Sequence, residues 1–237
     1  GIVTAAGNYT APAIAPSHHT QAVQAATTAG DQTSASSVDV VQREELTSAL
    51  TQLTAVAYFQ SLARFFVAEQ QLLSGAKMGL RREITTANAK ISEVSTSGTA
   101  SEFLQLPGDT ISKMLPYTDG VGNGHLLLAG KDTGKIYKLR LSNKNLVTVA
   151  TGFNQPTSMA LDPVSGDLYV SEAAGSQVTK VPRSTLESAS ATLSVLHALA
   201  AEPAMLVVPS PRGVAFDPCT GALYVTTADG ILREFLN

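Results

Sequence analysis

The side chains with the most regular spacing are two aspartates that each precede a proline. Asp162 and Asp217 begin two copies of the pattern Asp-Pro-x-x-Gly. A carboxylate at the start of a tight turn accepts hydrogen bonds from the backbone N–H groups that follow it. We therefore expect Asp162, Asp217 and the nearby Asp167 to stabilise turns and to take no part in catalysis.

The histidines and the single cysteine lack the neighbours that catalysis needs. No nucleophile motif accompanies His125 or His197, and the chain contains no Gly-x-Ser-x-Gly sequence. His18 and His19 are adjacent but have no third metal ligand near them in the sequence. Cys219 is the only cysteine, so it forms no disulfide within the chain, and we expect either a turn or buried thiol or an intermolecular link.

Basic residues gather in one short stretch, which contains Lys131, Lys135, Lys138, Arg140 and Lys144. On a strand, Lys138 and Arg140 share one face. Two interpretations are open: these cations keep an exposed sheet soluble, or they dock an acidic partner. The formal net charge of the chain is −3, and nucleic-acid binding needs a concentrated basic face, so we expect no nucleic-acid partner.

The two aspartates belong to a segment that occurs twice. Residues 156–172 and 211–227 align without a gap and share eight residues, among them Asp-Pro and Leu-Tyr-Val. Each copy reads as strand, turn and strand, which predicts a β-hairpin, and a weaker copy at 124–139 precedes them. The middle unit has four predicted strands: Ser158–Leu161, Asp167–Ser171, Gln177–Val181 and about Thr192–Ala198.

Four short strands that recur every ~40 to 50 residues are typical of a β-propeller blade. Residues from about 105 to 237 also resemble NHL-type repeats, in which Pro-x-Gly-Val-Ala-Phe-Asp-Pro precedes Gly-x-Leu-Tyr-Val. The string from Pro211 to Pro218 carries this resemblance most closely. About three blades are implied, and because closed propellers have roughly four to eight, the ring is incomplete.

The resemblance also implies where an active centre would lie. NHL-like and related propellers include lactonases, esterases and lyases, which generally hold a central metal ion on acids and Asn at the inner strand ends. Glu172 ends a Leu-Tyr-Val strand at such a place, whereas the equivalent positions are Thr227 and Gly130. Ca²⁺ takes six to eight oxygen ligands, and one acid does not supply them. We therefore expect no cofactor, with Glu172 as the one candidate ligand should Ca²⁺ bind.

In residues 42–98 the apolar side chains recur with a different period from that of the predicted strands. Leucines and other apolar residues recur at three-and-four spacing from Leu46 to Leu73, which predicts a long helix. Gly75 and Gly79 interrupt the pattern, and a second, shorter helix is expected from Leu80 to Val94.

The apolar residues of the long predicted helix lie on more than one of its faces. A helix that is apolar on two sides needs two partners. The helix is therefore expected either to pack on a domain core or to form a helix–helix or subunit interface. The candidates for that interface are Tyr58, Phe59, Leu62, Phe65 and Phe66.

Residues 1–41 alternate apolar and polar side chains, as at Val23 and Ala25, with the period of half-buried strands. This stretch resembles the C-terminal half of a bacterial Ig-like domain, in its Gly-x-Tyr-Thr-Ala-Pro string and in the Ser-Ala-Ser string that leads into Val-x-Val. Half a sandwich exposes unpaired edges and an apolar face. We therefore expect other chain to cover it, and the start at Gly1 in mid-motif suggests a processed product or part of a longer protein.

These patterns predict a mainly β protein in three parts: a partial Ig-like β-sandwich at 1–41, a helical spacer at 42–98 and an incomplete ring of NHL-like blades at 99–237. No apolar run approaches the ~20 residues of a membrane span. We expect a non-catalytic bacterial protein, extracellular or at the cell surface, with a structural or adhesive function. It would self-associate as a homo-oligomer or filament, or bind other chains that complete its β modules. The main alternative is a metal-dependent, lactonase-like propeller hydrolase or lyase whose remaining blades lie outside this sequence. A third possibility is a carbohydrate or protein receptor module that binds through loops of the propeller face.

Overall fold

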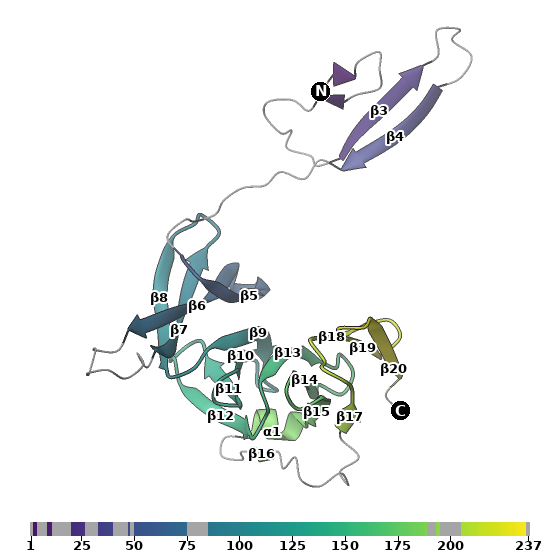
Figure 1. Ribbon diagram of the computed structural model, residues 1–237. Coiled ribbons are helices and arrows are strands. Elements are labelled where there is room, and N and C mark those ends of the chain that lie inside the picture. Colours follow the sequence, from purple (N-terminus) through teal and green to yellow (C-terminus); the bar gives the residue numbers. More distant parts are fainter. Residues whose placement is uncertain are drawn as a thin grey trace, which may run out of the picture. The chain divides into compact units, whose positions relative to one another are not determined.

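The computed structural model describes residues 2–3, 9–10, 20–26, 33–39, 47, 50–74, 85–188, 193–194 and 205–235 (Figure 1). The chain divides into two compact units, Gly1–Leu46 and Thr47–Asn237. Within the described residues no helix is both long and apolar enough to cross a lipid bilayer.

The first unit contains two short antiparallel pairs. Strand β1 (Ile2–Val3) pairs with β2 (Tyr9–Thr10), and β3 (Thr20–Ala26) pairs with β4 (Thr33–Asp39). The strand predicted around Val23 and Ala25 is thereby confirmed.

The second unit begins with a four-stranded antiparallel sheet in which each strand pairs with the next. Its strands are β5 (Leu53–Phe59), β6 (Arg64–Ser74), β7 (Thr85–Ser95) and β8 (Ala100–Pro107). A short 3-10 turn, η1 (Gln60–Leu62), joins the first two strands.

This sheet shows that the prediction of two helices in residues 42–98 is wrong. In β5 the side chains of Ala57 and Phe59 are buried while those of Val56 and Tyr58 are exposed, which is the two-residue period of a strand. β-Branched and aromatic side chains fit such a half-buried pleated surface, and here that preference outweighs the helical spacing of the leucines. The predicted boundary between residues 98 and 99 falls inside the sheet, because β8 pairs with β7.

The second sheet contains β9 (Ile111–Thr118), β10 (Gly124–Gly130), β11 (Lys135–Arg140) and β12 (Leu146–Thr151), again in antiparallel succession. The two-residue strand β16 (Leu193–Ser194) adds to its edge, parallel to β12.

The third and fourth sheets contain the two copies of the sequence repeat. The third consists of β13 (Pro156–Leu161), β14 (Leu168–Glu172), β15 (Gln177–Val181) and β17 (Met205–Val207). The fourth consists of β18 (Gly213–Phe216), β19 (Ala222–Thr226) and β20 (Ile231–Phe235).

Both predicted hairpins are confirmed, with Met159 opposite Val170 and Ala215 opposite Tyr224. The fourth strand predicted for the middle unit at about Thr192–Ala198 is wrong. Its described part, β16, pairs with the second sheet, and β17 completes the third sheet instead. The apolar Met205-Leu-Val run supplies that strand, and Val207 lies opposite Gln177.

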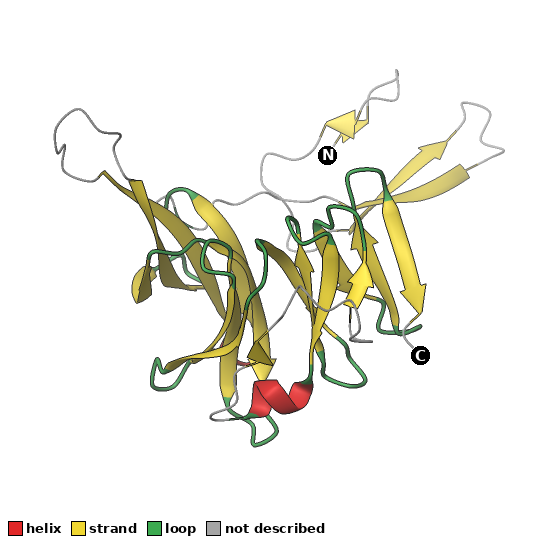
Figure 2. Ribbon diagram, turned by 60° about the horizontal axis from the view of Figure 1, so that its bottom comes forward, coloured by secondary structure: helices red, strands yellow, loops and turns green. Residues whose placement is uncertain are grey.

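The first strands of successive sheets are neighbours in space. Strand β9 lies against both β5 and β13, and β13 lies against β18. The sheets thus stand face to face about their first strands, and the short helix α1 (Arg183–Glu187), red in Figure 2, follows the third strand of the third sheet. This is the arrangement of adjacent propeller blades.

Each interface between neighbouring sheets has its own apolar core. Phe66, Ile91 and Ile111 belong to the core between the first and second sheets. Along β10, Leu126 and Leu128 enter that core, whereas Leu127 enters the core that the second sheet shares with the third. Because successive side chains of a strand point to opposite faces, one buried strand contributes to two cores.

Candidate functional site

The turn aspartates hold their turns as predicted. Asp162 accepts hydrogen bonds from the Val164 N–H at 2.8 Å and the Ser165 hydroxyl at 2.7 Å. Asp217 repeats this pattern with the next turn, in which Cys219 is exposed and forms no disulfide.

Asp167 is also structural, although it acts outside its own turn. Its carboxylate accepts a hydrogen bond from the Arg183 N–H at 2.8 Å, at the start of α1. It also lies 3.4 Å from the Lys180 ammonium.

Glu172, the candidate metal ligand, is fully buried within its own sheet. Its carboxylate accepts hydrogen bonds from the Asn154 N–H at 2.7 Å, the Gln177 amide at 2.9 Å and the Thr179 hydroxyl. Among the described residues, no three His, Cys, Asp or Glu side chains form a group that could hold a metal ion. The visible contacts therefore give Glu172 a structural role, tying three parts of the third sheet together.

Glu69 occupies the equivalent place in the first sheet. It accepts hydrogen bonds from the Thr51 N–H at 3.0 Å and the Ser92 hydroxyl at 3.1 Å, and it pairs with the Lys90 ammonium at 2.8 Å. Thr51 and Asn154 both precede the first strand of their sheets by two residues. Burial opposes ionisation, but the contacts with Lys90, Thr51 and Ser92 lower the pKa of Glu69 below its usual value.

In the second sheet the equivalent position is Gly130, and a carboxylate reaches the place from another direction. A Cβ on Gly130 would lie 2.1 Å from Oδ2 of Asp109. Asp109 precedes the first strand by two residues, and its carboxylate accepts hydrogen bonds from the Tyr137 hydroxyl at 3.0 Å and the Asp132 N–H at 3.0 Å. A buried carboxylate thus recurs in three sheets, and in each its described contacts lie within its own sheet or its connecting loops.

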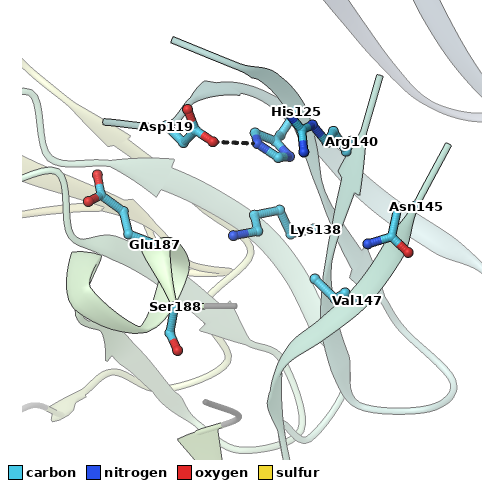
Figure 3. Close-up of a pocket in the computed structure, with 8 residues that line it drawn as sticks. All are labelled: Asp119, His125, Lys138, Arg140, Asn145, Val147, Glu187 and Ser188. Atoms are coloured by element: carbon cyan, nitrogen blue, oxygen red, sulfur yellow. Dashed lines mark hydrogen bonds and ion pairs between the residues drawn. The ribbon is translucent and has the colours of Figure 1, made fainter. Parts of the chain in front are cut away.

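A second group of polar residues lines a cavity of about 210 Å³ beside α1, which we call the α1 pocket (Figure 3). The residues around it are Asp119, His125, Lys138, Arg140, Asn145, Val147, Glu187 and Ser188. Strands β10, β11 and β12, the β9–β10 turn and the end of α1 contribute them.

Lys138 and Arg140 lie on one face of β11, as their spacing predicts, but that face is not exposed. Lys138 is only 8% exposed, so its prediction as a residue that keeps an exposed sheet soluble is wrong. Its ammonium donates a hydrogen bond to the carbonyl of Leu186 in α1, which covers this part of the sheet. Burial lowers the pKa of Lys138, while the negative charges of Asp119 and Glu187 act in the opposite direction.

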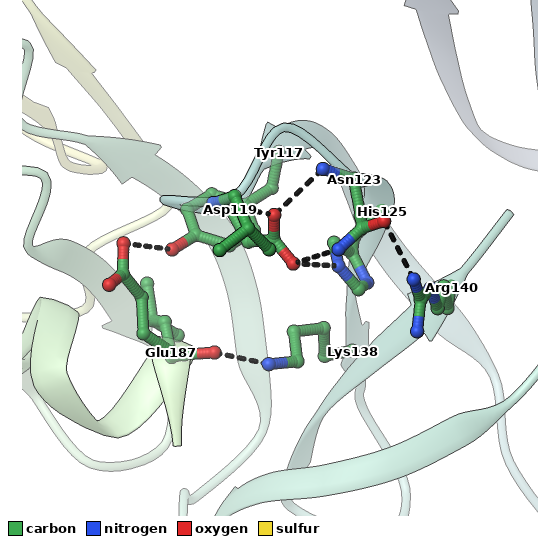
Figure 4. A network of polar contacts seen from close by, with 9 residues as sticks. Tyr117, Asp119, Asn123, His125, Lys138, Arg140 and Glu187 are labelled. Atoms are coloured by element: carbon green, nitrogen blue, oxygen red, sulfur yellow. Dashed lines mark hydrogen bonds and ion pairs between the residues drawn. The ribbon is translucent and has the colours of Figure 1, made fainter. Parts of the chain in front are cut away.

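Asp119 organises the other side of the α1 pocket (Figure 4). Its carboxylate accepts hydrogen bonds from the Asn123 side chain at 2.9 Å and the Asn123 N–H at 2.7 Å, and it lies 3.0 Å from Nε2 of His125. These contacts, with the Val121 N–H, hold the pKa of Asp119 well below its usual range. Asn123 in turn accepts a hydrogen bond from Arg140 at 2.6 Å.

Glu187, at the end of α1, is the last member of this network of polar contacts. It accepts hydrogen bonds from Nε of Arg183 at 2.8 Å and from the Tyr117 hydroxyl at 3.4 Å. Burial, together with the negative charge of Glu187, raises the pKa of Tyr117 to about 12. Tyr117 therefore stays a neutral hydrogen-bond donor in this network at neutral pH.

The sequence identifies His125, Lys138 and Arg140 only as separate features. The period of a strand places Lys138 beside Arg140, and the β9–β10 turn places Asp119 near His125. Glu187 lies in α1, after the third strand of the third sheet, about fifty residues after Lys138 and about seventy after Asp119. No local pattern connects it to the others. His18, His19 and His197 lie outside the described residues.

The predicted interface residues divide between core and surface. Phe59 is 6% and Phe66 1% exposed, so both belong to the core, and Phe66 packs edge-on against Phe103. The interface prediction is wrong for these two residues because their side chains are covered by this chain itself. Tyr58 and Leu62 remain 44% and 47% exposed.

The exposed apolar residues of this region form what we call the β5 surface. It consists of Leu53, Val56, Tyr58 and Leu62. Phe65, which is half-buried on β6, stacks its ring 4.8 Å from that of Tyr58. The opposite face of the first sheet packs on the second sheet.

The comparison with solved structures identifies the architecture. The chain is similar to a streptogramin B lyase, with a TM-score of 0.50 and 14% identity over 78% of this chain and 55% of that one. It is also similar to a chain of a nidogen/laminin complex, with a TM-score of 0.51 and 14% identity over 84% of this chain and 63% of that one. The second unit is a partial β-propeller.

No protein-family model and no curated protein sequence matches the chain. The propeller spans less than two thirds of the length of either structure named above. At 14% identity the likeness concerns the fold alone.

Proposed function

We propose that this protein is a non-catalytic structural or adhesive protein that self-associates through its β modules. The observation that carries the proposal is the β5 surface. Val56 is 60% and Leu53 59% exposed, on a sheet whose other face is buried. A propeller blade normally packs on a neighbour at both faces, so this surface suits a further β-sheet.

The far end of the propeller supports the same proposal. Ile231 and Leu232 on β20 are 69% and 44% exposed. Apolar residues are therefore exposed on both outermost described sheets, β5–β8 and β18–β20. Two such surfaces on one chain permit head-to-tail association of copies, which generates rings or filaments.

The remaining parts of the proposal rest on the sequence. The NHL-like repeats and the resemblance of residues 1–41 to half of a bacterial Ig-like domain favour a modular protein outside the cell or at its surface. The Ig-like segment would contribute a further site for pairing with other chain, because half a sandwich leaves strand edges open.

Light scattering tests self-association directly. We expect purified protein to give a mass that rises with concentration above the 24.6 kDa of one chain. A mass of 24.6 kDa at every concentration would contradict the proposal.

One observation favours a second function, that of a propeller hydrolase or lyase. His125 pairs with Asp119 in the α1 pocket, an arrangement that orients an imidazole for proton transfer. Turnover of a lactone or ester panel, lost in His125→Gln, would support this alternative. Equal rates for both proteins would count against it.

A further inference from the structure

We propose that the α1 pocket is a binding site for a small, singly charged oxyanion, such as a carboxylate or a phosphate group. The site lies between β11 and α1, away from the β5 surface, and it does not depend on self-association.

Two cations in this pocket lack a carboxylate partner. Within the described part of the chain, no acidic oxygen lies within 4.0 Å of the Lys138 ammonium or the Arg140 guanidinium. Lys138 uses one of its three donors, on the Leu186 carbonyl, and an uncharged carbonyl does not neutralise an ammonium. A buried charge is stable when a counter-charge accompanies it, so a ligand that supplies a negative charge fits here.

Two buried nitrogen atoms in the pocket have no hydrogen-bond partner among the described residues: Nε of Arg140 and Nδ1 of His125. His125 is 5% exposed, so water reaches its ring poorly. Buried polar atoms are nearly always hydrogen-bonded. The Nε–H of Arg140 is a donor and requires an acceptor, which an oxyanion supplies. Nδ1 of His125 is an acceptor when Nε2–H faces Asp119, so it requires a donor such as a hydroxyl group of the ligand.

The donor pattern suits an oxyanion. The Nε–H of a guanidinium and its neighbouring Nη–H present a planar pair of donors that matches two oxygens of a carboxylate or phosphate. Nη2 of Arg140, the nitrogen beside Nε–H, donates one of its two hydrogens to Asn123 at 2.6 Å, which holds the plane of the group and leaves the second hydrogen for a ligand. The Lys138 side chain extends from β11 toward Glu187 and α1, so its remaining donors lie on that side of the same cavity (Figure 3).

The acids of the pocket limit the charge of the ligand without filling the site. Asp119 is engaged by Asn123 and His125. Glu187 is engaged by Arg183, and with that arginine the region holds three cations against two carboxylates. These lysine and arginine side chains exceed the carboxylates by one charge, so a monoanion is favoured. The volume of about 210 Å³ lies below the ~300 Å³ that begins the range of drug-sized sites, which favours a small ligand.

Calorimetric titration of the whole protein tests the proposal, with sodium phosphate and sodium acetate as probes at constant ionic strength. We expect saturable binding of at least one of them. Lys138→Met and Arg140→Gln should each weaken that binding about tenfold or more, because each removes a charged donor that lines the pocket. Lys131→Met removes the same charge from an exposed position and should leave the affinity unchanged.

The two probes separate the possible sources of the anion, since binding of acetate alone indicates a carboxylate ligand and binding of phosphate alone a phosphoryl ligand. Absence of saturable binding of either would overturn the proposal, as would equal weakening by Lys131→Met. If Arg140→Gln does not fold, Lys138→Met still tests the site, and Lys138→Arg, which keeps the charge, should bind more tightly than Lys138→Met.

Discussion

The buried carboxylates of this protein fasten strands together. Glu69, Asp109 and Glu172 each accept hydrogen bonds from backbone or side chains of their own sheet or its connecting loops. These contacts satisfy the carboxylate oxygens within the protein itself. Stability measurements on single variants distinguish this structural role from the binding of a metal ion.

Replacing Glu172 by Gln should lower the free energy of unfolding by about 1–3 kcal/mol. The amide presents one oxygen where the carboxylate presents two, so a buried donor among Asn154, Gln177 and Thr179 loses its partner. Urea unfolding measures the change, with Glu102→Gln on the exposed surface as the control. Stabilisation of the natural protein by Ca²⁺, absent in Glu172→Gln, would instead support a metal site.

Glu69 should make stability depend on pH in the acid range. Its pKa in the folded protein lies below its usual value of 4.5, so the unfolded chain binds the proton more tightly. The stabilisation is complete above the usual pKa and is lost as the pH falls through the folded value. Urea unfolding from about pH 6 to about pH 3 should show this loss, and Glu69→Gln should flatten the curve. If the free energy of unfolding depended on pH equally in both proteins, Glu69 would not be the source of the pH dependence.

At the scale of elements, the burial pattern of the first sheet predicts unequal losses of stability when one buried and one exposed aromatic residue are truncated. Phe66→Ala should cost about 3–5 kcal/mol, the usual range for a buried phenylalanine. Tyr58→Ala should cost far less, since Tyr58 is 44% exposed and Phe66 1%. The urea midpoints of the two variants measure this contrast. Equal midpoints would show that the predicted difference in burial is wrong.

The elements that the sequence predicts well are those with a turn signal between two apolar runs. Asp162 and Asp217 mark such turns, and both hairpins form around them. Strands β5 to β7 have no comparable mark, and their leucines fall by coincidence at helical spacing. The alternation of Ala57 and Phe59 with Val56 and Tyr58 is the signal that identifies the strand.

The candidate site is predictable only in part for a related reason. The spacing of Lys138 and Arg140 predicts their shared face, but the burial of Lys138 depends on α1, which follows a strand of another sheet. A local pattern tells which side chains point the same way. It does not tell which distant segment covers them.

At the scale of the whole molecule, self-association predicts a specific loss in a β5 variant. Val56→Asp places a charge in the proposed contact, where burial without a partner is costly. We expect it to raise the dissociation constant of the assembly about tenfold or more. Val164→Asp makes the same change at a turn residue that is 84% exposed and should have no effect. Light scattering at matched concentrations compares the masses of the two variants. Equal masses would show that the β5 surface takes no part in the assembly.

The pair Gly130 and Asp109 has a consequence for comparing the repeats with one another. A carboxylate lies at the same place in three sheets, but in the second sheet a residue before the first strand supplies it. A glycine at position 130 leaves the room that the Asp109 carboxylate fills, because a side chain there would collide with it. Alignment of the blades by sequence therefore misses an acid that their superposition finds.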